Sequence, residues 1–242
     1  PIRQLSERYD VHVALNLIPG ESLPELEGRI TILSVGIERK ISPFMDILAL
    51  CQLVRLFRRY KFKIVHSVTP KAGLLAMLAA FLAGVDTRIH TFTGQVWASR
   101  SGVKRWLLRN MDRLIGYFAT NILVDSPSQR QFLLDEGVVS AAKSSVLHKG
   151  SVSGVELQRF KLDDDTRASL RLNFGFTDTD VVFLFIGRLN RDKGVVDLAS
   201  AFAVAAEVCP NIRLLMVGLD EENLEQELLQ ITSKYTDKVR FV

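Results

Sequence analysis

The feature that most constrains the fold is a regular alternation between short apolar segments and segments with helical periodicity. Segments with the length and composition of strands are Val11–Asn16, Ile30–Val35, Lys63–Val68, Thr87–Phe92, Asn121–Ser126 and Ser144–Lys149. Helical patterns lie between them, near residues 43–60, 71–83, 103–118 and 128–136. This alternation predicts an α/β fold with a parallel sheet covered by helices on both faces. Since such a sheet would normally begin with an earlier strand, we expect the first strand to be missing from the chain.

The helical pattern at residues 128–136 has clear start and end signals. Ser126 can cap its first turn, and Pro127 suits the first helical position. Gly137 suits the left-handed conformation that commonly follows a helix. These residues predict where the helix begins and ends.

The pattern changes between residues 150 and 178 and then restarts. This stretch is rich in Gly, Ser and Asp, and its one helical pattern lies near Asp165–Asn173. The continuously apolar segment VVFLFI (Val181–Ile186) follows, as expected for a strand buried on both faces. Later segments read as a helix at 194–208, a strand at 212–217, a helix at 222–235 and a strand at 239–242. We predict two Rossmann-like domains, residues 1–160 and 161–242, with the second one incomplete.

The bulk composition fits a soluble globular protein, with 48% hydrophobic and 24% charged residues. Charge is uneven: residues 1–160 hold 21 Lys and Arg against 13 Asp and Glu, whereas residues 161–242 hold 10 against 14. The basic half is compatible with a membrane surface, a phosphorylated ligand or a nucleic acid, and equally with ordinary surface charge. The two cysteines, Cys51 and Cys209, are far apart and form no disulfide framework. The longest apolar run, Ala72–Val85, has 14 residues and predicts a buried helix, being short for a membrane span.

An anion-binding loop is predicted directly after the strand at Val181–Ile186, where the sequence reads GRLNRDKG. Ligands of open parallel sheets bind beyond the carboxyl ends of strands, and N–H groups at a helix start favour anions. Arg188 and Lys193 add positive charge, and Gly187 and Gly194 allow close backbone approach. The alternative is a solvated connection. Because no G-x-G-x-x-G or G-x-x-x-x-G-K-[ST] pattern is present, a nicotinamide dehydrogenase and a P-loop nucleotidase are disfavoured.

Two further strand ends carry candidate ligand residues. The first is TRIHTFTGQVW, whose polar and aromatic side chains suit a sugar or another polyhydroxylated ligand; the candidates are His90, Thr93, Gly94, Gln95 and Trp97. His90 could act as a base or donor, or it could be a satisfied structural histidine. The second is HSVTPKAG, with His66, Thr69 and Lys71. Lys71 lies near a helix start, where it could meet an anion or simply be exposed.

The helical pattern at 103–118 combines an apolar stripe with a basic face. The stripe is Val103, Leu107, Met111, Leu114 and Phe118, and we expect most of it to lie in the core. Arg105, Arg109 and Arg113 share another face, near Trp106 and Tyr117. A basic amphipathic helix with aromatic residues can lie on an anionic membrane, so the arginines and Trp106 are the candidate membrane contacts.

No metal site is predicted, because the four histidines lack ligand spacing. The run Asp163–Asp165 resembles a metal-binding sequence, but its place just before a helical pattern favours a capping role.

Several segments resemble retaining glycosyltransferases of the GT-B fold, family four. They are IVHSVTPKAGLLAMLAA, RIHTFTGQVW, VDSPSQRQFLLDEGV, GSVSGVELQRF and FIGRLNRDKGVVDLASAF, in the order found in that family. The resemblance covers essentially the whole chain and looks closest to the bacterial branch that builds lipid-linked glycans for capsule, O-antigen or exopolysaccharide. It implies two Rossmann-like domains facing a cleft, the first for the acceptor and the second for a nucleotide-sugar, such as a UDP-sugar.

The resemblance also implies a hexosyltransferase that retains anomeric configuration, needs no metal or other cofactor, and works on the cytoplasmic face of the bacterial plasma membrane. Arg188 and Lys193 would stabilise the leaving diphosphate as catalytic residues. Donor contacts would come from Gly187, Arg188, Lys193, Gly194 and Gly218. Acceptor contacts would come from His66, Thr69, Lys71, His90, Thr93, Gly94, Gln95 and Trp97.

Two departures from the family pattern leave alternatives open. Many relatives have a His directly before the loop glycine, where this chain has Thr93, with His90 three residues earlier. The family's acidic E-x7-E region lies further downstream than Val242, which implies that these 242 residues alone are not an active transferase. The alternative is a non-catalytic module that binds a sugar nucleotide or a membrane. Nucleic-acid binding is disfavoured, because no known motif accompanies the basic excess.

Overall fold

The computed structural model describes residues 2–16, 30–38, 42–151 and 154–242 of the chain. The chain divides into two compact units, Pro1–Val155 and Glu156–Val242, so the boundary lies five residues before the one expected at residue 160. Every paired strand in the described residues runs parallel to its neighbour, which confirms the predicted α/β class.

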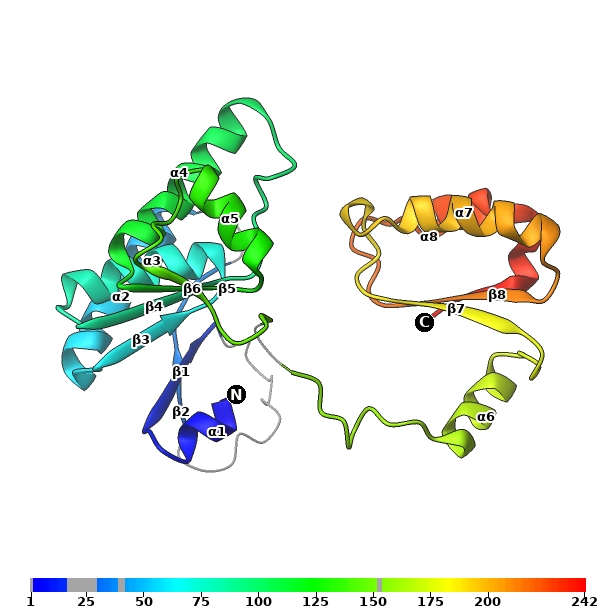
Figure 1. The fold of residues 1–242 in the computed structure, drawn as a ribbon, viewed down its shortest axis with the longest axis horizontal. Helices are drawn as coiled ribbons and strands as arrows, with labels where there is room; N and C mark the ends of the chain where they lie inside the picture. Colours follow the sequence, from blue (N-terminus) through cyan, green and yellow to red (C-terminus); the bar gives the residue numbers. More distant parts are fainter. Residues whose placement is uncertain (1, 17–29, 39–41, 152–153) are drawn as a thin grey trace. The chain divides into compact units, whose positions relative to one another are not determined.

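The first unit contains two parallel sheets (Figure 1). One sheet pairs β1 with β2, and the other has the order β3-β4-β5-β6. The strands are β1 Val11–Leu15, β2 Ile30–Ser34, β3 Ile64–Ser67, β4 Thr87–Phe92, β5 Asn121–Val124 and β6 Ser144–Val146. All six strands expected from the sequence are present. Because β3 to β6 pair in chain order and in parallel, their carboxyl ends meet at one edge, where ligand residues are expected.

The helices of the first unit contact these strands or one another. They are α1 Ile2–Ser6, α2 Pro43–Tyr60, α3 Pro70–Leu82, α4 Gly102–Phe118 and α5 Pro127–Asp135. Helix α3 contains the long apolar run and contacts both α2 and α4. Its residues Met77, Ala79 and Ala80 are fully buried, which confirms the predicted buried helix. Within the described part of the chain, no helix is both long and apolar enough to cross a bilayer.

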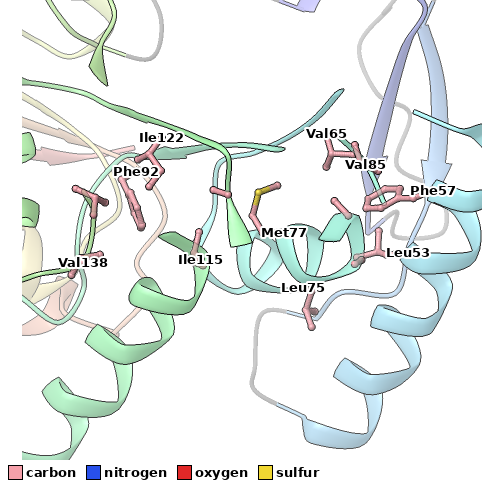
Figure 2. Packing of buried hydrophobic residues seen from close by; sticks show 14 of the residues in the cluster. Leu53, Phe57, Val65, Leu75, Met77, Val85, Phe92, Ile115, Ile122 and Val138 are labelled. Atoms are coloured by element: carbon pink, nitrogen blue, oxygen red, sulfur yellow. The ribbon is translucent and has the colours of Figure 1, made fainter. Parts of the chain in front are cut away.

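Side chains from α2, α3, α4, α5 and the four-stranded sheet form most of the core of the first unit. Figure 2 shows Leu53 and Phe57 of α2, Met77 of α3 and Ile115 of α4 in this cluster, together with Phe92 of β4. Burial of apolar surface stabilises the fold by roughly 25 cal/mol per Å². This core fixes the strand ends that present the candidate ligand residues.

The signals that bound α5 act as the sequence predicts. The Ser126 hydroxyl accepts a hydrogen bond from the backbone N–H of Gln129 at 3.1 Å. Gly137 follows the helix with a φ of +64°, in the left-handed region. Both ends of α5 are therefore set by local chemistry.

The second unit has one parallel sheet of order β7-β8-β9. Its elements are α6 Asp164–Asn173, β7 Val181–Ile186, the 3₁₀ helix η1 Arg191–Lys193, α7 Val195–Val208, β8 Ile212–Val217, α8 Glu225–Ile231, the 3₁₀ helix η2 Ser233–Lys238 and β9 Val239–Phe241. Helices α7 and α8 lie on the same face of the sheet (Figure 1). The helix expected at 222–235 is shorter than predicted, because the chain continues as η2 after α8.

The burial expected for β7 is wrong. Helices α7 and α8 cover the face on which Leu214 and Met216 of β8 are fully buried. The alternate residues of β7 point to the other face, and Ile186 is 74% exposed. A continuous apolar run predicted the strand correctly, but only tertiary structure decides whether both of its faces are covered.

One smaller expectation is confirmed in the second unit. The Asp163 carboxylate accepts a 2.7 Å hydrogen bond from the backbone N–H of Thr166, which lowers the pKa of Asp163 and caps α6 as predicted. Among the described residues, no group of three or more His, Cys, Asp and Glu side chains could hold a metal ion. The two cysteines are free and exposed, Cys51 on α2 in the first unit and Cys209 after α7 in the second.

Candidate functional site

The segment after β7 forms a tight turn into α7. Asn190 is buried, and its side-chain oxygen accepts a 3.1 Å hydrogen bond from the backbone N–H of Lys193. This bond caps the start of η1. Gly194 has a φ of +73° and ends η1, so that α7 can begin at Val195. The turn leaves the side chains of Arg188 and Lys193 exposed at the carboxyl end of the strand. The sequence placed these two cations correctly at this edge, and what they bind stays a prediction.

Arg188 forms an ion pair that the sequence did not predict. Its Nη1 lies 3.0 Å from both carboxylate oxygens of Glu221, which follows β8. Asn190 donates a second hydrogen bond, from Nδ2, to the same carboxylate at 3.2 Å. The Arg188 side chain is still 51% exposed. Glu221 therefore joins the loops that follow β7 and β8 at the predicted anion-binding position.

The backbone at Gly218 lies in close contact with the backbone at Gly187, and both are predicted donor glycines. A Cβ atom built on Gly218 would lie 2.0 Å from the carbonyl oxygen of Gly187, and Gly218 has a φ of +145°. Only glycine fits such a position, because any side chain would collide with backbone. The close approach brings the Glu221 loop beside Arg188, which gives Gly218 a structural reason.

In the first unit, two histidines lie at the carboxyl ends of β3 and β4. His66 is exposed, and its Nε2 lies 2.8 Å from the Thr91 hydroxyl. Partial burial lowers the pKa of His66. His66 is therefore a neutral, accessible imidazole near neutral pH, able to donate or accept a hydrogen bond to a ligand.

His90 is buried and differs from His66 in its surroundings. Its Nδ1 pairs with the Ser67 hydroxyl at 2.8 Å, and its ring packs edge-on against Phe92. A Cβ atom on Gly73 would lie only 2.5 Å from the His90 ring, so α3 packs directly against the ring. Burial, aided by repulsion from His66, lowers the pKa of His90 to about 4. These contacts favour the structural alternative for His90 over the expected acceptor contact.

The loop after β4 exposes Thr93 and Gly94 and anchors Gln95. The Gln129 side chain of α5 donates to the Gln95 side-chain oxygen at 3.3 Å and accepts from the backbone N–H of Asp125 at 2.8 Å. The Gln95 Nε2 is buried without a hydrogen-bond partner in the described residues. Thr93 and Gly94 are therefore the accessible part of this loop.

Trp97 does not line a ligand surface, which differs from the acceptor contact expected for it. Its side chain is 0% exposed and stacks on Phe132 of α5. The indole N–H donates a 2.7 Å hydrogen bond to the buried Asp112 carboxylate of α4. Burial raises the pKa of Asp112 to about 6, against the opposing effect of this hydrogen bond. Trp97 thus positions the loop by tying it to α4 and α5.

Lys71 is not a free cation. Its Nζ lies 2.6 Å from the Asp46 carboxylate of α2. Thr69 is exposed directly before α3, and its side chain makes no capping hydrogen bond. Of these two candidates, Thr69 is the one whose side chain is open to a ligand.

The arginines on the basic face of α4 form ion pairs and hydrogen bonds within the first unit. Arg105 and Arg109 pair with Glu136 at 2.6 and 2.8 Å, and Arg113 donates to the carbonyl oxygens of Glu136 and Gly137. Hydrogen bonds from Arg109 and Arg105 lower the pKa of Glu136. The arginines hold the end of α5, which favours a structural role over the membrane contact that the sequence suggested.

The apolar stripe of α4 was expected to lie mostly in the core, but most of it lies outside. Its exposed members form one face together with two aromatic residues; this α4 apolar face is Val103, Trp106, Leu107, Leu114 and Tyr117. Asp112, Ile115 and Gly116 are the residues that face the interior. Tertiary packing, including the contact with α3, decides which side of this helix is buried.

Sequence reasoning missed the acidic partners of these sites. Asp112 and Glu136 read as ordinary charges in helical segments, and Glu221 as part of an acidic run. Their partners lie 15 to 33 residues away in the sequence, so no local pattern could reveal the pairs.

Comparison with known proteins identifies the class. The chain resembles the crystal structure of HepE from Anabaena in complex with UDP-glucose, with a TM-score of 0.67 at 19% identity over 88% of this chain and 56% of that one. This likeness shows a fold of the GT-B type. Residues 2–150 match the family described as glycosyl transferase 4-like domain. The chain therefore belongs to the glycosyl transferase 4-like family.

Two curated relatives extend the comparison. The capsular polysaccharide biosynthesis glycosyltransferase CapM of Staphylococcus aureus is 30% identical over 221 residues, which are 90% of this chain and 56% of CapM. The UDP-Gal:α-D-GlcNAc-diphosphoundecaprenol α-1,3-galactosyltransferase of Escherichia coli is 27% identical over 186 residues, 74% of this chain and 46% of that protein. The chain thus spans about half the length of these relatives.

Proposed function

We propose that the protein is a hexosyltransferase that moves a sugar from a UDP-sugar to a lipid-linked saccharide, with retention of configuration, in the synthesis of capsule, O-antigen or exopolysaccharide. The observation that carries this proposal is the pair of exposed cations, Arg188 and Lys193, at the carboxyl end of β7 in a chain of this family. The names of the two curated relatives support the glycan pathway and the lipid-diphosphate acceptor. The UDP-glucose complex of HepE supports the donor class.

The proposed chemistry places growing negative charge near Arg188 and Lys193. When the glycosidic bond to the donor breaks, the nucleoside diphosphate leaves with the bonding electrons. Preorganised cations stabilise such charge more than water does, because they need no reorganisation during the reaction. The start of α7 at Val195 follows Lys193 and Gly194 directly, and its backbone N–H groups would also favour an anion.

On the acceptor side, we propose that the exposed groups at the carboxyl edge of the first unit bind the saccharide. These groups are His66, Thr69, Thr93 and Gly94, and the half-buried Gln95 lies beside them. Neutral imidazole, hydroxyl and amide groups pair well with sugar hydroxyls. In this proposal His90, Lys71 and Trp97 hold these groups in place.

A transfer assay with the full-length protein tests this function. The protein is incubated with UDP-glucose, UDP-galactose or UDP-N-acetylglucosamine and an undecaprenyl-diphosphate-linked sugar, and the products are analysed by mass spectrometry and NMR. We expect one added hexose with the anomeric configuration of the donor. Binding of UDP without transfer from any donor would instead support a non-catalytic sugar-nucleotide module, and the absence of both would refute the proposal.

We further propose that the protein associates peripherally with the inner face of the bacterial plasma membrane through the α4 apolar face. Trp106 is 60% exposed and Tyr117 also lies on this face, as is typical of interfacial helices. Lys104 is exposed on the same helix and adds a positive charge toward anionic headgroups. A lipid-linked acceptor would lie in that membrane.

Replacing Leu107 with glutamate is expected to weaken binding to vesicles that contain phosphatidylglycerol by about tenfold, because a charge is placed on the apolar face. Sedimentation with vesicles measures the change. Leu172→Glu is the matched control, since Leu172 is exposed on α6 in the other unit. Equal loss in both variants, or no loss in Leu107→Glu, would exclude this face as the membrane contact.

A further inference from the structure

We propose that Glu221 is a positioning residue for Arg188, and that it orients the guanidinium for bidentate contact with the donor diphosphate. This inference rests on the proposed function and adds a residue to the donor site.

Glu221 binds one nitrogen of the Arg188 guanidinium. Both carboxylate oxygens lie 3.0 Å from Nη1 of Arg188. Within the described residues, Nε and Nη2 of Arg188 have no hydrogen-bond partner. Nε and Nη2 form the side-on edge of the guanidinium, whose parallel N–H groups match two oxygens of a phosphate. Glu221 therefore fixes one corner of the group and leaves the phosphate-binding edge open.

Glu221 is itself held in place. Its backbone N–H donates to the Leu189 carbonyl oxygen at 3.2 Å, and Asn190 donates to its carboxylate. Asn190 is buried and also accepts from the backbone N–H of Lys193. The carboxylate is thus connected to the turn that carries both predicted diphosphate ligands. Without such support, an exposed arginine would sample many rotamers and lose conformational entropy on binding.

The second unit contains a comparable pair that serves as a contrast. Arg191 pairs with Glu227 of α8, and both side chains are partly exposed. That pair joins η1 to α8 and lacks the link through Asn190 to Lys193. If both ion pairs were purely structural, removal of either glutamate would have the same effect on UDP binding. A positioning role for Glu221 predicts different effects.

The test compares Glu221→Ala, Glu221→Gln and the control Glu227→Ala in the full-length protein. Calorimetry gives the Kd for UDP, and steady-state assays give kcat and KM for the UDP-sugar. We expect Glu221→Ala to raise the Kd and KM by about tenfold, because the oriented edge of Arg188 is lost. Glu221→Gln keeps an oxygen acceptor for Nη1 and removes a negative charge near the diphosphate. It is expected to bind UDP within about threefold of wild type, or more tightly.

A spectroscopic readout separates orientation from charge. NMR of the arginine side chains in the ligand-free protein should show the Arg188 guanidinium restricted in wild type and Glu221→Gln, and mobile in Glu221→Ala. Unchanged UDP binding in Glu221→Ala, or an equal loss in Glu227→Ala, would overturn the role of Glu221 while leaving the proposed function standing. A wild-type protein that neither binds UDP nor transfers sugar would refute both proposals.

Discussion

Replacing Arg188 with alanine is expected to lower kcat/KM for the UDP-sugar by about a hundredfold, on the scale of losing one donor to a developing oxyanion. The guanidinium is exposed at the carboxyl end of β7, where it can reach the leaving diphosphate in our proposal. Its removal would also leave the Glu221 carboxylate without its arginine partner, so that an uncompensated negative charge would face the diphosphate. Initial rates at varied donor concentration measure the effect.

Two companion variants make this prediction specific. Arg188→Lys keeps the charge but loses the planar fork, so it should recover only part of the activity. Arg167→Ala is the matched control, because Arg167 is an exposed arginine on α6 in the same unit. A loss below threefold in Arg188→Ala would refute the diphosphate role.

Replacing Asp112 with asparagine is expected to raise the free energy of unfolding by roughly 3 kcal/mol at pH 8, with little difference near pH 4. Burial raises the pKa of Asp112 from 3.8 to about 6 in the folded protein. The folded state therefore keeps this proton through a pH range in which the unfolded chain releases it. Wild type loses stability as the pH rises from about 4 to about 6, and the loss is complete above that range. Asparagine cannot ionise, and its side-chain oxygen can still accept from Trp97.

Urea unfolding followed by tryptophan fluorescence measures this difference, because both tryptophans, Trp97 and Trp106, belong to the first unit. Asp86→Asn is the matched control, since Asp86 is exposed in the same unit. If Asp112→Asn destabilised the protein equally at both pH values, the charge on Asp112 would not be what limits stability.

Local features of the fold could be predicted from the sequence, and features set by tertiary packing could not. Strands, the caps of α5 and the position of Arg188 after β7 depend on neighbouring residues, and the sequence predicted them. The orientation of α4 does not, because Leu114 and Ile115 are both apolar and only packing decides which one is buried. His66 and His90 likewise lie on adjacent strands near one edge of the sheet. Only the contacts with Ser67 and Gly73 show that His90 is enclosed. The pairs that fix the candidate site, such as Arg188 with Glu221, depend on strand order and could not be predicted from local patterns.

The placement of the two cysteines has a practical consequence. Cys51 and Cys209 are both exposed and free, and each unit carries one of them. Spin labels or fluorophores attached to these thiols would report the distance between the two units without any introduced cysteine. Pulsed electron resonance or energy transfer could then follow that distance as UDP, a UDP-sugar or lipid vesicles are added. The natural sequence therefore already carries the pair of attachment points needed to learn whether ligands change the arrangement of the units.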